Sequence, residues 1–334
     1  MSGITVCVQS YNHDKYIGIC IDSLIKQNFK NFEIIIFDDG STDKSLEIIK
    51  SYIDKFDFIS LIKTRTPKNQ TNFNIIIDHS KKFQKYFTVF HCDDFFHKDI
   101  LKNLFLTMEN NKSLLACGTD GYHVDENSKI SGYPKIPNKI KNSSIFDQKQ
   151  YVQHLFQYGF FFLNPSFIYK TEFFLKKKIY YNYKKFGYAN DAGFFLELSK
   201  YGKIGLLNKK LLYYRVFKYS ITGKFVKKSI KENDIFKVLR FCFKLKFKKN
   251  EKRSFIKMYN FLKMIDNTKI NLKKILLKKD LNFEVVYISK NLLYSFSSLS
   301  NFSKIIFCFF MKYLVLFFPS RPIFIKINSF FKII

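Results

Sequence analysis

The sequence contains no tryptophan and is poor in acidic residues, with 27 Asp and Glu against 57 Lys and Arg, a formal charge of +30. The shortage is uneven: residues 201–334 hold 6 acidic and 30 basic side chains, whereas residues 1–200 hold 21 and 27. A protein that is uniformly basic along its whole length would not show this division, so that class is excluded. Because Phe, Lys, Ile and Asn have AT-rich codons, genome composition is an alternative source of part of the bias.

Several sequence signals are also missing. Met1–Ser10 has no basic segment followed by a long apolar core, so we expect no signal peptide. The six cysteines are far apart and show no CxxC or zinc-type Cys/His spacing, which predicts reduced thiols in the cytoplasm. No GxGxxG or GxxxxGK[ST] loop occurs, which argues against dehydrogenase and P-loop readings. The most apolar stretch, Ile305–Phe318, is interrupted only by Lys312 and is shorter than the roughly 20 residues of a membrane-spanning helix.

The chain is nevertheless that of a folded protein, since 47% of its residues are hydrophobic and 19% aromatic. Its first 120 residues alternate short apolar runs with segments that repeat apolar residues at helical spacing. We expect strands at 4–9, 32–37, 58–62, 86–90 and 114–119 and helices at 16–27, 45–56 and 101–108. Further along we expect helices at 147–158 and 190–201, strands at 164–170 and 206–215, and helical segments at 230–249 and 272–279. The βαβ alternation predicts an α/β domain with a mostly parallel sheet flanked by helices.

Polar residues stand where three of these strands end. Ser10-Tyr11-Asn12 follows the first strand, Asp38-Asp39 the second, and His91-Cys92-Asp93-Asp94 the strand at 86–90. Ligands of open α/β sheets bind beyond the carboxyl ends of the strands. The strand ends therefore predict a binding site rich in carboxylates at one edge of the sheet.

These segments resemble a known family. The run TVCVQSYNHDKYIGICIDSLIKQNFKNFEIIIFDDGSTDKSLEII, the later FHCDD, the pair Asn190-Asp191 before a helix, and Tyr214-Arg215 occur in the order typical of family 2 glycosyltransferases of the GT-A fold. The resemblance covers roughly residues 3–222. It implies a GT-A fold, a nucleotide-sugar donor, a divalent cation and an inverting transfer.

The chain departs from the family pattern at three positions. His91 stands where Asp is common, Asn190 replaces the usual Glu, and Phe217 stands where His is frequent. These changes bear on fine specificity more than on the reaction class. They also motivate an alternative, a GT-A-like protein that binds nucleotide sugars without catalysis.

The resemblance assigns metal binding to Asp93 and Asp94, with Mn²⁺ or Mg²⁺ as the ion and Asp93 also near the ribose. A hard cation with oxygen ligands neutralises a diphosphate leaving group. Asp38 and Asp39 are expected to bind the nucleoside. The alternative reading of both carboxylate pairs is ordinary turn or capping chemistry.

Five further residues receive roles. Tyr11 is expected to stack on the base, with Gln9 and Ser10 nearby. Asp191 is the expected general base, which takes a proton from the acceptor hydroxyl; the alternative is a helix cap. Arg215 is expected to contact the diphosphate or the acceptor, with a structural ion pair as the alternative.

Composition divides the chain into an expected catalytic domain at 1–223 and a basic, aromatic, mostly helical extension at 224–334. Basic residues among Phe, Leu and Ile suit a segment that lies on an anionic bilayer. A helical extension packed on the catalytic domain is the alternative, and nucleic-acid binding is a weaker one. The family resemblance favours the membrane, because bacterial relatives often glycosylate lipid-linked acceptors.

We therefore expect a cytoplasmic glycosyltransferase, peripheral on the inner face of the inner membrane and without a nucleic-acid partner. The expected donor is a UDP-hexose or UDP-N-acetylhexosamine. The expected acceptor is a hydroxyl of a surface glycan, such as lipooligosaccharide or capsule, or of a lipid-linked oligosaccharide.

Overall fold

The computed structural model describes residues 3–67, 71–134, 136, 140, 145–217 and 233–276. The chain divides into two compact units, Met1–Lys218 and Tyr219–Ile334, and each is described by itself. The expected domain boundary at 223, residues 277–279 of the last expected helix and the apolar run Ile305–Phe318 lie outside the described residues.

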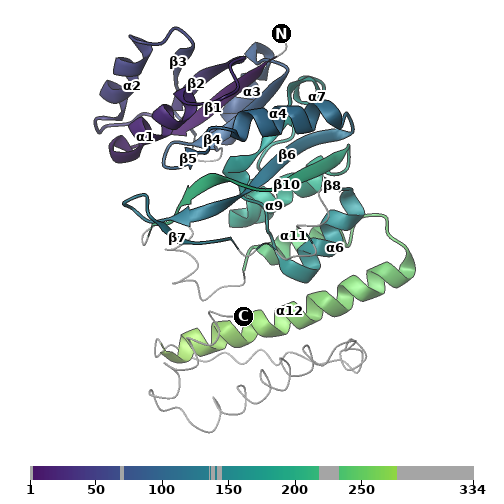
Figure 1. Ribbon diagram of the computed structural model, residues 1–334. Coiled ribbons are helices and arrows are strands. Elements are labelled where there is room, and N and C mark those ends of the chain that lie inside the picture. The colour runs from purple at the N-terminus through teal and green to yellow at the C-terminus, as the bar shows by residue number, and fades with distance from the viewer. Residues whose placement is uncertain are drawn as a thin grey trace. The chain divides into compact units, whose positions relative to one another are not determined.

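One mixed sheet forms the centre of the first unit, with the strand order β3-β2-β1-β4-β9-β6-β10-β5 (Figure 1). β7 pairs with β6, and β8 with β10. The strands are β1 (Ile4–Ser10), β2 (Phe32–Asp38), β3 (Ile59–Lys63), β4 (Tyr86–His91), β5 (Phe95–Phe96), β6 (Leu114–Val124), β7 (Ile130–Gly132), β8 (Ile145–Phe146), β9 (Ile168–Lys170) and β10 (Lys203–Arg215). The helices are α1 (Asp14–Ile25), α2 (Ser45–Ile53), α3 (Asn72–Asp78), α4 (Ile100–Asn110), α6 (Gln148–Tyr158), α7 (Thr171–Lys176), α8 (Tyr183–Phe186) and α9 (Asn190–Leu198).

Strand β1 lies at the point where the strand order reverses. It runs parallel to both β2 and β4, and Ile4 is paired with Phe32 on one side and Tyr86 on the other. β10 is parallel to β6, whereas the short β9 and β5 are antiparallel to their neighbours. The expected α/β fold is thus confirmed. The reversal beside β1 makes the carboxyl ends of β1 and β4 the place where such a sheet binds ligands.

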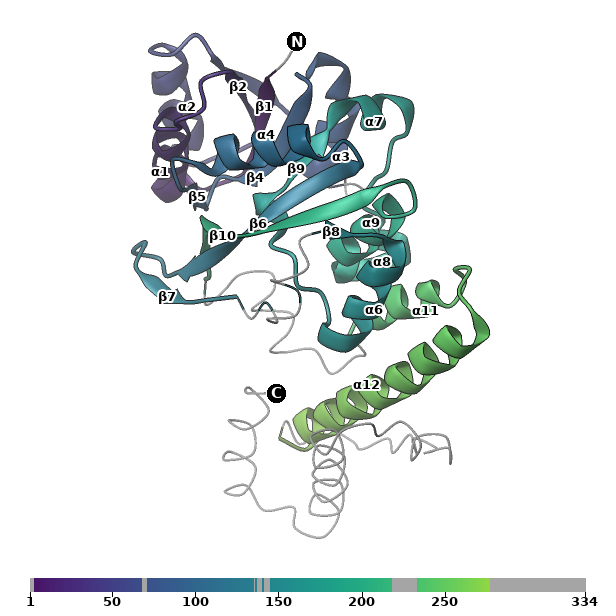
Figure 2. The same ribbon diagram turned by 45° about the vertical axis from the view of Figure 1, so that its right-hand side comes forward.

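Both faces of the parallel strands β1, β2 and β4 are largely buried, which explains their near-continuous apolar sequences. Ile4, Val6 and Val8 of β1 belong to one core cluster with α1, which contributes Ile17, Cys20, Ile21 and Leu24 at helical spacing. Aromatic rings fill the opposite face, where Phe87 of β4 stacks on Tyr169 of β9 at 5.3 Å. In both ribbon views α1 and α2 lie on one side of β1–β3 and α3 on the other (Figures 1 and 2).

Two segments differ from the sequence-based expectation. The strand expected at 164–170 begins as a 3₁₀ turn, Asn164–Ser166, and only Ile168–Lys170 is a strand. Pro165 lies in the first positions of that turn, where its missing N–H costs no ladder hydrogen bond. Helix α3 was not expected; Thr71 caps it by accepting a hydrogen bond from the backbone N–H of Asn74.

The described part of the second unit consists of α11 (Ile235–Cys242) and α12 (Lys249–Leu276). Tyr259 of α12 joins the two helices, because its ring contacts those of Phe236 and Phe243 and its hydroxyl accepts a 3.0 Å hydrogen bond from Arg240. The helical segment expected over 230–249 is interrupted, because α11 ends at Cys242 and α12 begins only at Lys249. Among the helices of the described ranges, none combines the length and the apolar content that crossing a bilayer requires.

Candidate active site

The strand register brings the predicted polar residues together at the carboxyl edge of the sheet. Ser10, the last residue of β1, is paired with Asp38, the last residue of β2. Gln9 is paired with His91 at the end of β4. Three segments that are distant in the sequence thus end side by side at the switch point.

Asp38 is buried, and its carboxylate is occupied by its own loop. One oxygen accepts hydrogen bonds from the backbone N–H groups of Gly40 (3.1 Å) and Ser41 (2.9 Å). The other accepts from the hydroxyls of Ser10 (3.0 Å) and Ser41 (2.6 Å). Gly40 has φ +84°, a conformation that glycine adopts without a steric penalty. Asp38 therefore fixes the turn in which Asp39 stands.

Asp39 and Tyr11 are the more accessible of the predicted nucleoside contacts. Asp39 is half-buried and accepts from the backbone N–H of Thr66 at 2.6 Å. The Tyr11 side chain is 54% exposed. The loops that carry them are joined, because the Asn12 amide oxygen accepts from the backbone N–H of Thr42 at 2.8 Å.

His91, Asp93 and Asp94 form the only candidate metal cluster found within the described residues, and their donor atoms lie within 4.8 Å of one another. Asp94 is 1% exposed. Its Oδ1 accepts from the backbone N–H of Arg215 at 2.8 Å, and its Oδ2 has no hydrogen-bond partner in the described ranges. A buried carboxylate oxygen without a partner is costly unless a cation or a proton satisfies it.

The electrostatics of this cluster agree with a cation site. Burial, followed by the charge of Asp93, raises the pKa of the Asp94 carboxyl well above its usual range. Burial lowers the pKa of His91, which leaves a neutral ring able to offer a lone pair. Sequence reasoning treated His91 as a departure and missed it as a candidate ligand. The available signal was its position: His91 is the last residue of β4, three residues before Asp94.

Arg215 ends β10 and is 2% exposed. Its Nε donates to the backbone carbonyl of Asp93 at 2.8 Å. Its Nη1 donates to the carbonyl of Asp125 at 2.7 Å, and its Nη2 to the Ser128 hydroxyl at 2.9 Å. Buried contacts to neutral oxygens thus occupy the guanidinium that was expected to contact the diphosphate or to form an ion pair.

Asp191 lies at the N-terminus of α9. The alternative reading of Asp191 as a helix cap is wrong, because the 3₁₀ turn Gly187–Ala189 runs directly into α9. Ala189 is the cap residue, and no side chain caps the helix. The Asp191 carboxylate accepts from the backbone N–H of Ala192 at 3.0 Å. Burial nevertheless dominates and raises the pKa of Asp191 to about 6.

Tyr214 lies within electrostatic reach of both carboxylate groups. Burial raises the pKa of its phenol, and the negative charges of Asp94, Asp93 and Asp191 raise it further, in that order. The charges of the candidate metal ligands and of the candidate base thus both act on this partly buried tyrosine. Sequence reasoning noted Tyr214 only as part of a motif and gave it no role.

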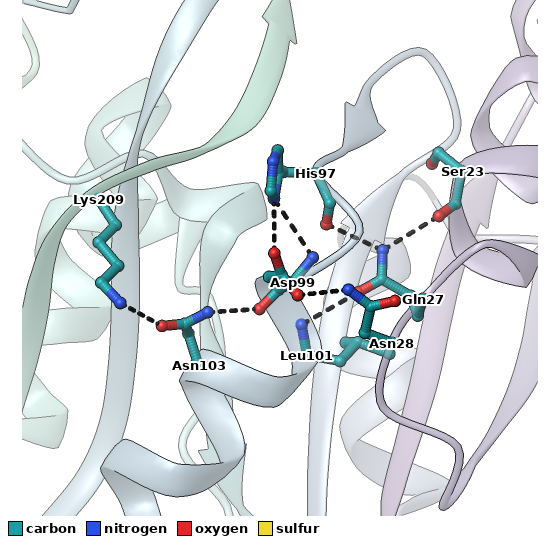
Figure 3. A network of polar contacts seen from close by, with 8 residues as sticks. All are labelled: Ser23, Gln27, Asn28, His97, Asp99, Leu101, Asn103 and Lys209. Atoms are coloured by element: carbon teal, nitrogen blue, oxygen red, sulfur yellow. Dashed lines mark hydrogen bonds and ion pairs between the residues drawn. The ribbon is translucent and has the colours of Figure 1, made fainter.

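A polar network fixes the chain segment that follows Asp94 (Figure 3). The buried Gln27, which follows α1, donates to the backbone carbonyls of Ser23 and His97, both at 3.0 Å, and accepts from the N–H of Leu101 at 3.2 Å. The Asn28 amide donates to Asp99 at 2.6 Å. These contacts attach the start of α4 to the end of α1.

Comparison with known proteins identifies the class. The model of glycosyl transferase family 2 matches residues 5–173, about half of the chain, and the chain belongs to this family. The resemblance inferred from the sequence is thereby confirmed.

Two relatives illustrate the similarity. Glycosyltransferase GlyA of Streptococcus pneumoniae is 27% identical over 236 residues, which are 67% of this chain and 32% of GlyA. Poly(ribitol-phosphate) beta-N-acetylglucosaminyltransferase TarS of Staphylococcus aureus is 26% identical over 223 residues, 64% of this chain and 35% of TarS. The chain thus spans about a third of the length of these two proteins.

The structural comparison confirms the GT-A fold. The structure of TarS 1-349 in complex with UDP matches with a TM-score of 0.58 at 19% identity, covering 84% of this chain and 76% of that one. The mannosyltransferase PcManGT from Pyrobaculum calidifontis, in complex with GDP-Man and Mn²⁺, matches with a TM-score of 0.55 at 10% identity, covering 94% and 87%.

Proposed function

We propose that this chain is an inverting, divalent-metal-dependent glycosyltransferase that moves a sugar from a nucleotide donor to an acceptor hydroxyl. The observation that carries the proposal is the unsatisfied Oδ2 of the buried Asp94, which lies beside Asp93 and His91 at the switch point of the sheet. A surface turn or a helix cap does not require a buried carboxylate of this kind.

The donor set fits a hard divalent cation. Asp93 and Asp94 offer carboxylate oxygens, which suit Mn²⁺ or Mg²⁺, and His91 offers an additional nitrogen. When bound, the ion supplies positive charge to the diphosphate leaving group. His13, whose Nε2 lies 3.9 Å from Asp93, adds a nearby group that can carry positive charge.

Asp191 is the proposed catalytic base. A carboxyl with a pKa of about 6 is mostly ionised at neutral pH, and it is more basic than an ordinary Asp. It therefore suits removal of the proton from the acceptor hydroxyl as that oxygen attacks the anomeric carbon. The nucleoside diphosphate leaves from the opposite face, so no second protein acid is required.

The donor is proposed to be a UDP-sugar, in agreement with the UDP complex of the structurally similar TarS. Tyr11, Gln9 and Asp39 are the proposed nucleoside contacts, with Asp93 near the ribose. Ser10 and Asp38 act in the same site by holding the loop through their 3.0 Å hydrogen bond.

The acceptor is proposed to be a hydroxyl of a bacterial surface glycan or a lipid-linked oligosaccharide. The names of two relatives support an acceptor of this kind. TarS is a poly(ribitol-phosphate) beta-N-acetylglucosaminyltransferase, and a Methanococcus voltae relative is a glucuronosyltransferase whose name gives a dolichyl N-acetyl-alpha-D-glucosaminyl phosphate. The basic second unit is proposed to keep the enzyme at the cytoplasmic face of the membrane that carries such acceptors.

The direct test is release of UDP from a panel of UDP-sugars in the presence of Mn²⁺ and an acceptor extract. We expect Asp94→Asn and Asp191→Asn each to lower the rate by about 10²-fold or more. Asp99→Asn is the matched control, because Asp99 is a partly exposed carboxylate of the neighbouring network and lies outside the site. Full activity in either site variant would refute the assignment.

The alternative is a GT-A-like protein that binds nucleotide sugars without catalysis. It is suggested by the departures from the family pattern at His91 and Asn190. It predicts that UDP-sugars raise the melting temperature of the wild type while no acceptor yields UDP. Transfer that Asp191→Asn abolishes, with UDP-sugar binding retained, excludes this alternative.

A further inference from the structure

The side chain of Arg215 connects two loops at the carboxyl edge of the sheet. Its Nε holds the backbone carbonyl of Asp93 in the loop after β4. Its two terminal nitrogens hold the turn between β6 and β7, through the carbonyls of Asp125 and Glu126 and the hydroxyl of Ser128. A single guanidinium thus fixes the metal-binding loop to a β-turn more than 30 residues away in the sequence.

The main chain of the same residue holds the other candidate ligand. The backbone N–H of Arg215 donates to Oδ1 of Asp94, which orients the carboxylate and leaves Oδ2 without a partner among the residues that the structure describes. Residue 215 therefore fixes Asp93 by its side chain and Asp94 by its backbone. A cation site needs its ligands fixed in this way, because they must be held close together against their mutual repulsion.

The surroundings of the guanidinium favour a structural arginine. The central carbon lies 4.3 Å from the ring centroid of Tyr16 and 5.8 Å from that of Phe95. With aromatic rings over its plane and neutral oxygens at its edge, the group is removed from solvent, and only its planar fork satisfies all these partners. A lysine keeps the charge but reproduces neither the fork nor the stacking.

We propose that Arg215 is a positioning residue that preorganises Asp93 and Asp94 for the cation and does not itself bind the donor. This inference rests on the metal site of the proposed function. Three side-chain hydrogen bonds to the Asp125–Ser128 turn and one to the Asp93 carbonyl make the position of the ligand loop depend on residue 215.

The test is Arg215→Lys in the full chain, with Mn²⁺ affinity measured by the loss of the free Mn²⁺ signal in electron paramagnetic resonance. The substitution keeps the formal charge, so a change in affinity reports geometry. We expect Mn²⁺ to bind at least tenfold more weakly, while UDP affinity without metal, measured by calorimetry, stays within twofold of the wild type.

Thr5→Val is the matched control for general loss of stability. Thr5 is buried at the opposite end of β1, where its hydroxyl donates to Glu33 at 2.6 Å and accepts from the N–H of Gln84 at 2.8 Å. This variant should melt at a lower temperature and keep wild-type Mn²⁺ affinity at a temperature where both variants are folded.

The outcomes are separable. Wild-type Mn²⁺ affinity in Arg215→Lys, or an equal loss in Thr5→Val, overturns the positioning role. An equal loss of UDP affinity with and without Mn²⁺ assigns Arg215 to the donor and also overturns it. A wild-type protein that binds no Mn²⁺ refutes the metal site of the proposed function, and the positioning role with it.

Discussion

At the scale of single residues, the burial of Asp191 has a structural cost and suits its proposed role as the base. Its pKa in the folded protein is about 6, above the 3.8 of an ordinary Asp, because burial disfavours the charged form. A base must be ionised to accept a proton. We therefore expect kcat/KM to rise with pH and to level off above a midpoint near 6, as measured by UDP release between pH 4.5 and 8. A profile that is flat across this range would exclude Asp191 as the base.

The same pKa shift predicts a change in stability. Since the folded state binds the Asp191 proton more tightly than the unfolded state, stability falls as the pH rises from about 4 to about 6. Asp191→Asn removes the buried charge, so it should raise the melting temperature at pH 8 relative to the wild type and have little effect at pH 4. Equal shifts in melting temperature at both pH values would show that the buried charge of Asp191 is not the cause of the change in stability.

The residue scale also shows how far the sequence could lead. Asp38, Asp93 and Asp94 were predicted because they follow strands whose ends meet at one edge, and strand ends can be read from apolar runs. The burial of Asp38 and Arg215 could not be predicted. Three of the hydrogen bonds of the Arg215 side chain, for example, go to backbone oxygens at 93, 125 and 126, and no side-chain pattern encodes backbone oxygens.

At the scale of elements, the packing of α9 sets the place of Asp191. Gly193 faces the ring of Phe186, and a β-carbon at this position would overlap that ring. Gly193→Ala must displace α9 or Phe186, so we expect it to destabilise the protein by about 1–3 kcal/mol and to lower activity. Chemical denaturation and UDP release measure the two effects.

Gly18 in α1 is the matched control. A β-carbon there would meet nothing nearer than the Tyr52 hydroxyl at 3.7 Å. Gly18→Ala should therefore stabilise the protein by up to about 1 kcal/mol, from the higher helix propensity of alanine, with activity unchanged. Destabilisation by both substitutions would show that crowding against Phe186 is not the cause.

Elements were predicted best where periodicity was long. The strands β1, β2 and β4 and the helices α1, α2 and α4 agree with the sequence to within about three residues at each end. Short elements such as α3 and β5 have too few residues to show a period, and tertiary contacts define them. Phe73 of α3, for example, stacks on Tyr181 at 4.2 Å, a partner more than 100 residues later.

At the scale of the whole molecule, a bound cation should stabilise the fold. Ligands that bind only the native state raise its melting temperature by mass action. We expect Mn²⁺ to raise the melting temperature, UDP to add to the effect, and a chelator to reverse it, as followed by calorimetry. In Asp94→Asn the Mn²⁺ effect should disappear, and its persistence would place the ion elsewhere.

The charge of the second unit makes a separate prediction. Residues 233–276 carry 13 basic and 3 acidic side chains. The full chain should sediment with vesicles that contain about 30% anionic lipid and should detach when salt screens the charges. It should not bind purely zwitterionic vesicles. Salt-sensitive binding to RNA with no vesicle binding would favour the nucleic-acid alternative instead.

The position of β10 at the end of the first unit has a consequence for biosynthesis. The ribosome delivers β1 to β4 first, and these parallel strands carry the early carboxylates, but Asp191 and Arg215 emerge about a hundred residues after Asp94. Contacts so distant along the chain form late in folding. A nascent chain therefore builds β1 to β4 before Arg215 can hold the loop of Asp93 and before the proposed base is present. Under the proposed function, it stays inactive toward nucleotide sugars until β10 inserts between β6 and β5.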